Sequence, residues 1–221
     1  AVCGRCDAPS GGEGAGGVSA FIVEGDTPGL SFGKKEEKMG LRASPTVEVV
    51  MRDVVIPATN LLGSEGDGFK VAMTALDSGR ITIAAISAGI AQAALDTSAA
   101  YACQRKQFKR AIIDFQGVGF MLADMASKIE CSRLLVRKAA SLRDAERPYS
   151  HIAAMAKCVA TDTSIEVATD AVQVLGGYGY TREYPVERYM RDAKVMQIVE
   201  GTNQVQRLVI SRHLKKIYGD I

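Results

Sequence analysis

The sequence has no tryptophan, and aromatic residues of all kinds make up only 6% of its 221 residues. It also has no excess of one charge: 27 Lys and Arg stand against 25 Asp and Glu, for a formal net charge of +2. Dedicated nucleic-acid and membrane-surface binders show a basic excess, so this balance argues against both classes. No apolar run approaches the ~18 residues needed to span a bilayer. General disorder is excluded as well, because 47% of the residues are hydrophobic.

Residues that bind metals are scarce. His151 and His213 are the only histidines, and the five cysteines are an odd number. Three of those cysteines lie inside helical patterns, which argues against a disulfide framework. Cys3 and Cys6 form a lone C-x-x-C with no second pair and no histidine nearby. We therefore expect ordinary thiols in a reducing compartment and no metal site.

Glycine and proline are rare only in the later part of the chain. Of the 22 glycines, 14 lie between Gly4 and Gly79, and four of the six prolines lie in the same part. The composition therefore changes near residue 65 from turn-rich to helix-compatible. We interpret this change as a domain boundary, with residues 1–64 forming one domain and residues 65–221 another.

The first domain reads as short strands separated by turns. Residues 18–23, 46–51 and 54–56 favour β-structure, and Pro57 ends the last of them. The glycine-rich residues 8–17 predict a surface loop. Short strands with such punctuation predict an antiparallel sheet or a partial barrel.

The second domain reads as helices. Amphipathic or apolar patterns predict helices over about 69–104, 114–146, 150–175 and 202–218. We expect a further short helix after Tyr184-Pro185, with the proline in its first turn. Asp114 and Ser150 are the candidate N-caps of the second and third helices. In the third helix we place Ile152, Met155, Val159, Thr163 and Val167 on one buried face. The predicted fold is mainly α: an up-down four-helix bundle preceded by a partial antiparallel β domain.

Two polar segments stand out from the packing pattern. Asp77-Ser-Gly-Arg80 interrupts an apolar helix, and its arginine either reaches solvent or clamps an anion. Composition alone favours the solvent-reaching arginine. Arg105-Lys-Gln-Phe-Lys-Arg110 is a basic cluster at a helix–helix turn. It is either a solvated turn or a pyrophosphate-binding segment.

Two later segments offer similar alternatives. The glycines of Gln173-Val-Leu-Gly-Gly-Tyr-Gly-Tyr180 are either a helix C-cap or a place where backbone approaches a planar cofactor. Glu200, in Gln197-Ile-Val-Glu-Gly-Thr-Asn-Gln204, is either a surface carboxylate at a helix start or a general base. A carboxylate in an apolar cleft, with a pKa raised by desolvation, suits proton abstraction near neutral pH.

The order and spacing of these motifs are specific together. Arg191-Asp-Ala-Lys194 followed by the Glu200 motif, with the Gln173 glycine motif and Tyr184-Pro-Val-Glu187 before it, closely resembles the acyl-CoA dehydrogenase family. Upstream, Thr27-Pro-Gly-Leu30, Met39-Gly-Leu-Arg42, Val55-Ile-Pro57 and Leu62-Gly63 resemble the middle β domain of that family. The resemblance covers the chain from about residue 18.

The resemblance implies the chemistry. Glu200 matches the family's catalytic base, which removes the α-proton of an acyl-CoA thioester while the β-carbon passes hydride to flavin N5. Gly201 matches a residue that lets the chain pass close to the thioester, and Asp77 and Arg80 match residues that contact CoA. Some relatives carry the base immediately before the arginine, where this chain has Gly79. The chain therefore resembles the members that use a base at the Glu200 position.

The resemblance also implies FAD as cofactor. The matching cofactor positions are Arg105, Gln107, Phe115, Gln116, Gln173, Gly176, Gly177, Thr202 and Gln204. Because the family shares FAD between protomers, a homodimer or homotetramer is implied, with an electron-transfer flavoprotein as acceptor. A role in fatty acid metabolism is implied too, in the bacterial cytoplasm or, in a eukaryote, the mitochondrial matrix. The chain departs from the family at Lys109, where glycine is usual after the phenylalanine.

The sequence begins within the β domain of the matched family and lacks its N-terminal helical domain. We therefore expect a fragment that is inactive unaided. Two other functions stay open at this point. One is an acyl-CoA oxidase of the same fold, which passes its electrons to oxygen, and the other is a helical oligomerisation scaffold without activity.

Overall fold

The computed structural model describes residues 2–5, for which only the backbone is discussed, and residues 14–219. These residues form two compact units. The first runs to Lys38 and continues over Arg42–Leu76, and the second comprises Met39–Leu41 and the chain from Asp77 on. The boundary between residues 64 and 65 stays a prediction from composition.

The first unit contains two small antiparallel sheets. One has the order β1-β2-β5, with Val2 opposite Phe21 and Ala20 opposite Leu62. The other pairs β3 with β4, and Ser31 lies opposite Val50. The elements are β1 (Val2–Arg5), the 3₁₀ turn η1 (Gly14–Gly17), β2 (Val18–Phe21), β3 (Leu30–Phe32), β4 (Val49–Met51), the 3₁₀ turn η2 (Ala58–Asn60) and β5 (Leu61–Leu62).

The prediction of a strand over residues 54–56 is wrong. After β4 the backbone turns through Asp53, whose φ is 51°, and Val55 is 83% exposed. No strand is assigned to residues 54–56, so their β-branched composition has no neighbouring strand to pack against. Of the predicted loop over residues 8–17, residues 8–13 lie outside the described part of the chain, and residues 14–17 form η1.

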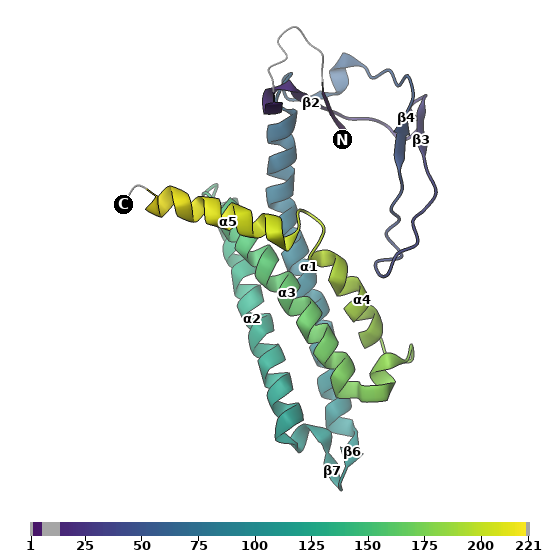
Figure 1. Ribbon diagram of the computed structural model, residues 1–221, viewed down its shortest axis with the longest axis vertical. Helices are drawn as coiled ribbons and strands as arrows, with labels where there is room; N and C mark the ends of the chain where they lie inside the picture. Colours follow the sequence, from purple (N-terminus) through teal and green to yellow (C-terminus); the bar gives the residue numbers. More distant parts are fainter. Residues whose placement is uncertain (1, 6–13, 220–221) are drawn as a thin grey trace. The chain divides into compact units, whose positions relative to one another are not determined.

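The second unit is helical (Figure 1). Its helices α2, α3 and α4 run beside α1, and α5 crosses α3 near the beginning of that helix. The elements are α1 (Gly68–Gln104, which begins in the first unit), β6 (Lys106–Gln107), β7 (Arg110–Ala111), the 3₁₀ turn η3 (Ile112–Asp114), α2 (Gln116–Asp144), α3 (Ser150–Leu175), the 3₁₀ turn η4 (Gly176–Tyr180), α4 (Val186–Met196) and α5 (Asn203–Tyr218). The predicted fold class, mainly α with small antiparallel sheets, is confirmed.

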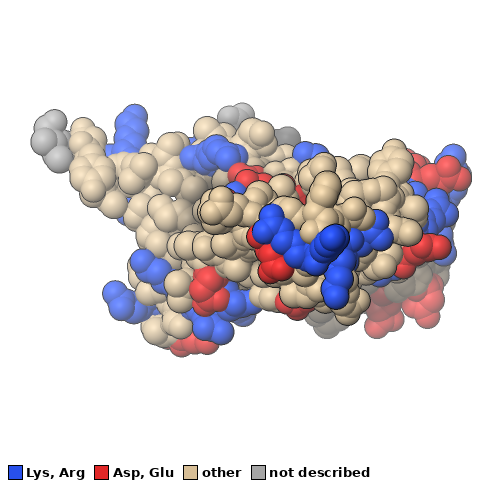
Figure 2. All heavy atoms as spheres, turned by 90° about the horizontal axis from the view of Figure 1, so that it is seen from below, with Lys and Arg blue, Asp and Glu red and all other residues tan. Residues whose placement is uncertain are grey.

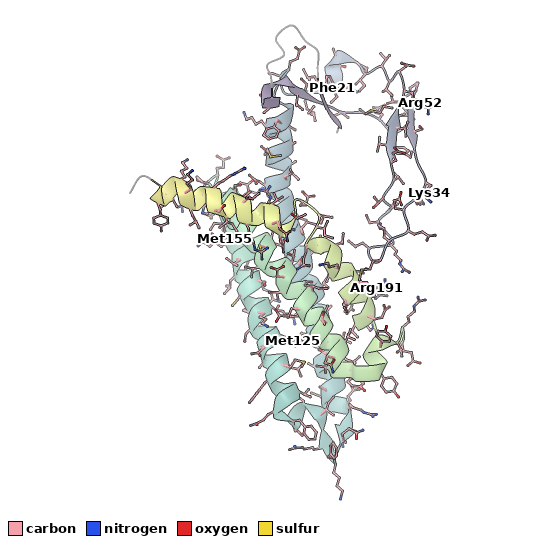
Figure 3. All side chains as sticks on the ribbon, in the orientation of Figure 1. Phe21, Lys34, Arg52, Met125, Met155 and Arg191 are labelled. Carbon is pink, nitrogen blue, oxygen red and sulfur yellow. The ribbon has the colours of Figure 1, made fainter. Side chains whose placement is uncertain are left out.

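One apolar core joins four of these helices. Its buried residues come from α1, α2, α3 and α4, and they include Ala94, Met125, Val167 and Val186. Figure 3 labels Met125 on α2, and its side chain is only 1% exposed. Among the described residues, α1 is the one helix that is long and apolar enough to cross a membrane, with a mean hydropathy of 1.2. Because its buried alanines belong to this core, we interpret α1 as a core helix.

Helix α3 is the centre of the unit. Fifteen of its 26 residues are buried, and most of them are Ala, Ser, Thr or Val, whose small side chains let α2, α4 and α5 pack closely around it. A helix covered on several sides has no single apolar face. The single predicted face therefore fails at Val159, which is 39% exposed, whereas Lys157 is fully buried.

Both predicted N-caps are wrong by one residue. Phe115 occupies the N-cap of α2, and Asp114 ends the preceding 3₁₀ turn η3. Tyr149 occupies the N-cap of α3, and the Ser150 hydroxyl donates to Asp77 Oδ1 at 2.9 Å instead of capping the helix. In α5, by contrast, Thr202 is the N-cap and its side chain accepts from the Val205 N–H.

Candidate active site

Glu200 lies on a tight turn between α4 and α5. Its φ is 55° and that of Gly201 is 86°, so two consecutive residues have left-handed backbone. Glycine adopts this conformation freely, but a residue with a Cβ pays about 1–2 kcal/mol for it. Such strain at a glutamate persists only where the surroundings hold it, and it is typical of functional positions.

The Glu200 side chain rests against α1 at Gly79. A Cβ built on Gly79 would lie 2.6 Å from Glu200 Oε2, which is closer than any real contact. The absence of a side chain at residue 79 therefore creates the space that the carboxylate occupies. Among the residues that the structure describes, neither the Glu200 carboxylate nor its backbone N–H has a hydrogen-bond partner. Both groups are available to a substrate.

Asp77 and Arg80 lie one turn of α1 apart beside this turn. They form an ion pair, and Arg80 is only 6% exposed. The interpretation favoured by composition, an arginine that reaches solvent, is therefore wrong. The Arg80 Nε is buried and has no partner among the described residues, which leaves one charged donor unsatisfied.

A buried polar cluster lies beneath the Glu200 turn. Lys157 Nζ, on α3, donates to the Gly201 carbonyl at 3.0 Å and to Asn203 Oδ1 at 2.9 Å. Gln206 Nε2 donates to the Glu200 carbonyl at 3.2 Å and to the Gly201 carbonyl at 2.9 Å. Burial lowers the pKa of Lys157 to about 8.

Asp162 joins three elements around the same turn. Its Oδ1 accepts from Gln197 Nε2 at 2.6 Å and from Asn203 Nδ2 at 2.7 Å, and its Oδ2 pairs with Arg207 at 3.1 Å. These contacts connect α3, the end of α4 and α5. The turn that carries Glu200 is therefore held from both sides.

The Arg191-Asp-Ala-Lys194 motif has a structural explanation on α4, where Figure 3 labels Arg191. Arg191 pairs bidentately with Glu187 and donates to the Met39 carbonyl at 2.9 Å. Asp192 accepts from the Leu41 N–H at 2.7 Å. Between them Gly40 leaves no room for a side chain, because a Cβ there would lie 2.4 Å from the Arg191 carbonyl oxygen. The motif fastens residues 39–41 to α4.

A second group of candidate residues surrounds a hollow of about 470 Å³ at the other end of α1. Arg105 and Gln107 line it from the β6–β7 hairpin, and Gly176 and Gly177 line it from the end of α3. Gly176, with a φ of 60°, is the C-cap of α3. A Cβ on either glycine would meet nothing within 4 Å, so the backbone here faces open space. The sequence offered two alternatives for these glycines, a helix C-cap and an unobstructed backbone surface. In the structure they are both.

The hairpin itself is exposed and basic. Figure 2 shows Lys and Arg side chains gathered over this end of the unit, and residues 103–110 are all exposed. Phe108 and Lys109 both have left-handed backbone, with φ of 50° and 67°, so Lys109 stands where a glycine is conformationally easier. Phe115 packs edge-on against Phe108 and under Arg110. Gln116 and Gln173 are exposed nearby on α2 and α3.

The structure thus separates the predicted site residues into two groups. Glu200, Gly201, Asp77 and Arg80 form the first, and Thr202 and Gln204 continue it into α5. The second surrounds Arg105. Between Arg80 and Gln104, α1 spans about 36 Å at 1.5 Å per residue. One dinucleotide cannot reach both groups within a single chain.

Comparison with known proteins identifies the family. Residues 66–215 match the family model described as the C-terminal domain of acyl-CoA dehydrogenase. The chain belongs to the acyl-CoA dehydrogenase family. It is 53% identical over 193 residues to the short-chain-specific acyl-CoA dehydrogenase of Megasphaera elsdenii, an alignment that covers 87% of this chain and 50% of that protein.

Solved structures of acyl-CoA dehydrogenases agree. Butyryl-CoA dehydrogenase from Megasphaera elsdenii superposes with a TM-score of 0.92 at 50% identity, over 96% of this chain and 55% of that one. A chain in the structure described as the electron transferring flavoprotein of Acidaminococcus fermentans gives a TM-score of 0.93 at 54% identity. That superposition covers 96% of this chain and 55% of the other. The chain spans about half the length of the relatives it matches.

Sequence reasoning missed four residues around the Glu200 turn: Lys157, Asp162, Asn203 and Gln206. One signal for Lys157 was present, because it is the only basic side chain apart from His151 in the 26 residues of α3. Asn203 belongs to the Glu200 motif, but nothing in the sequence indicated that its side chain would contact Thr161 and Asp162 on α3. Asp162 and Gln206 carried no signal, because acidic and amide residues on helices usually face water.

Proposed function

We propose that this chain carries the catalytic base and parts of the CoA and flavin sites of an FAD-dependent acyl-CoA dehydrogenase that acts on short-chain thioesters. The observation that carries the proposal is the Glu200 carboxylate, which is held on a strained turn against Gly79 with no internal partner. The relatives that are short-chain-specific or named for butyryl-CoA support the substrate class.

In this proposal Glu200 removes the α-proton of the thioester. The Glu200 N–H, which meets no acceptor in the described part of the chain, donates to the thioester carbonyl and stabilises the developing enolate. The Gly201 backbone, which has no side chain, allows the thioester to approach. Arg80, with its free Nε, offers a buried positive charge to the CoA portion.

The residues around the 470 Å³ hollow fit a dinucleotide. Arg105 offers a guanidinium for phosphate, Gln107 an amide, and the glycines 176 and 177 an unobstructed backbone surface. Bound FAD would supply the hydride acceptor for the β-carbon. Phe115, Gln116, Gln173, Thr202 and Gln204 remain proposed cofactor contacts.

We extend the proposal to partners. Two cofactor-contact groups about 36 Å apart along α1 support a flavin site shared between copies of the chain, and hence a homodimer or homotetramer. The similarity to a chain in an electron transferring flavoprotein structure supports such a flavoprotein as electron acceptor.

The test is Glu200→Gln in the protein as expressed from its own gene, with any flanking segments. We expect dehydrogenation of butyryl-CoA to fall at least about a thousandfold, because the amide cannot accept the proton. Flavin absorbance should stay at the wild-type level, since the substitution keeps shape and volume. Turnover within tenfold of wild type would reject Glu200 as the base. Oxygen consumption without an added acceptor would instead support an oxidase.

A further inference from the structure

Lys157 is unusual for a lysine. It is fully buried on α3, although lysine is almost never buried unless it is paired. Its ammonium has no direct ion-pair partner among the described residues, because its two acceptors are the neutral Gly201 carbonyl and the neutral Asn203 amide. Burial of a charge without a carboxylate partner is unfavourable, so the fold retains Lys157 at the expense of stability.

The ammonium is directed at the residues on either side of Thr202. It binds the Gly201 carbonyl before the α5 N-cap and the Asn203 side chain after it. Asn203 is in turn fixed by Thr161 at 2.9 Å and by Asp162 at 2.7 Å. A left-handed turn has to be held by its surroundings. Here the Lys157 ammonium binds the backbone oxygen of Gly201 within the turn and the side chain of Asn203, the first residue of α5.

We propose that Lys157 is a positioning residue for Glu200: its buried ammonium locks the left-handed Glu200–Gly201 turn and so holds the carboxylate in place against Gly79. This inference rests on the proposed function, because it assigns Lys157 a role in proton abstraction through Glu200. Lys157 itself does not touch the substrate.

Gln206 assists but cannot replace Lys157. Its Nε2 binds the Glu200 and Gly201 carbonyls from within α5, the helix that the turn itself leads into. Asp162 and Thr161, which also lie on α3, bind only the side chains that flank the turn. Among the described residues of α3, the most buried helix of the unit, only Lys157 binds a backbone oxygen of the turn itself. Without the ammonium, the Gly201 carbonyl keeps only its bond to Gln206, and the Glu200–Gly201 turn can shift relative to Gly79.

Amide hydrogen exchange of the 221-residue chain gives a readout that needs neither flavin nor substrate. The Asn203 N–H donates to the Gln197 carbonyl at 3.1 Å and closes the turn. In Lys157→Met, which keeps the length of the stem but loses all three donors, exchange at Asn203 should rise at least tenfold. Thr163→Val is the control, because it removes a buried hydrogen bond to Ser132 from the same helix without touching the turn.

If Lys157→Met does not fold, Lys157→Gln keeps two amide N–H donors on a shorter stem and should show a smaller rise at Asn203. Unchanged exchange in whichever variant folds overturns the proposal. So does an equal rise in Thr163→Val, because the effect would then be general destabilisation.

Kinetics separate this proposal from the proposed function. In the protein as expressed from its own gene, Lys157→Met should lower kcat at least tenfold and leave KM for butyryl-CoA within about twofold. In a Glu200→Gln background, Lys157→Met should lower the residual rate no further. An active Glu200→Gln variant would overturn the proposed function and leave the exchange result standing. An inactive Glu200→Gln variant together with a fully active Lys157→Met variant would overturn only the role of Lys157.

Discussion

At the scale of single residues, the site depends as much on a missing side chain as on a present one. The resemblance to the family pointed to Gly79 because some members carry their base there. The structure places Gly79 in contact with the Glu200 carboxylate, so the two sequence positions, 121 residues apart, border one space. A base from either position can therefore enter the same volume.

This proximity leads to a prediction for Gly79→Ala. The substitution should leave the free energy of unfolding unchanged or raise it by up to about 1 kcal/mol, because alanine favours a helix interior. Turnover should nevertheless fall at least tenfold, because the new Cβ takes the place of the Glu200 carboxylate. Urea unfolding and a butyryl-CoA assay on the same preparation check both parts.

Gly89→Ala is the matched control for that prediction. Gly89 lies on the same helix, and a Cβ there meets nothing within 4 Å. It should raise stability to a similar extent and leave turnover intact. Equal losses of activity in both variants would show that stiffening of α1, rather than displacement of Glu200, is responsible.

At the scale of elements, sequence reasoning recovered the helices well and their contacts poorly. The order and type of the four long helices followed from their patterns, because long amphipathic or apolar segments carry a strong signal, and the short helix α4 followed from Pro185. The prediction that Ser150 is an N-cap was wrong because its hydroxyl donates a hydrogen bond to Asp77, 73 residues away in the chain. The exposure of Val159 and the burial of Lys157 were not predicted for a related reason: α3 is enclosed by three helices, and a single-face pattern cannot describe it.

The contact between α3 and α5 includes the only two histidines of the chain, and it leads to a prediction about pH. The rings of His151 and His213 stack at 3.7 Å between centroids. Burial lowers the pKa of His151, and the charges of His213 and Lys138 lower it further. Below the ordinary histidine pKa of about 6.5 the unfolded chain therefore binds more protons than the folded chain, so stability falls as the pH drops.

We expect the loss for this pair between pH 7.5 and pH 5 to be below about 1 kcal/mol, because solvent screens a partly exposed ring. His151→Gln should reduce the pH dependence of urea unfolding over that range and leave stability above pH 7.5 nearly unchanged. A variant with the same pH dependence as wild type would show that His151 does not contribute to it.

At the scale of the whole molecule, the sequence indicated which residues belong to a site but not how many chains build one. The glycines of 173–180 and the basic cluster of 105–110 were identified from local composition as separate candidates, and in the structure residues of both line one hollow. Their separation from Glu200 could not be read from the sequence, because it depends on the contact of Glu200 with Gly79, 121 residues earlier in the chain. That helix places the two groups at opposite ends of the second unit.

If the proposed flavin site is shared between copies, two defective variants should complement each other. Glu200→Gln removes the proposed base, and Arg105→Glu repels the cofactor phosphate at an exposed position that tolerates substitution. In a mixed oligomer, an intact Glu200 from one copy then meets an intact Arg105 from the other, and one kind of site is restored. Co-expression of the two variants should therefore recover a quarter to a half of wild-type turnover, although each variant alone is inactive. If one chain supplied both residues to its own site, every site in the mixture would carry a defect, and co-expression would restore nothing.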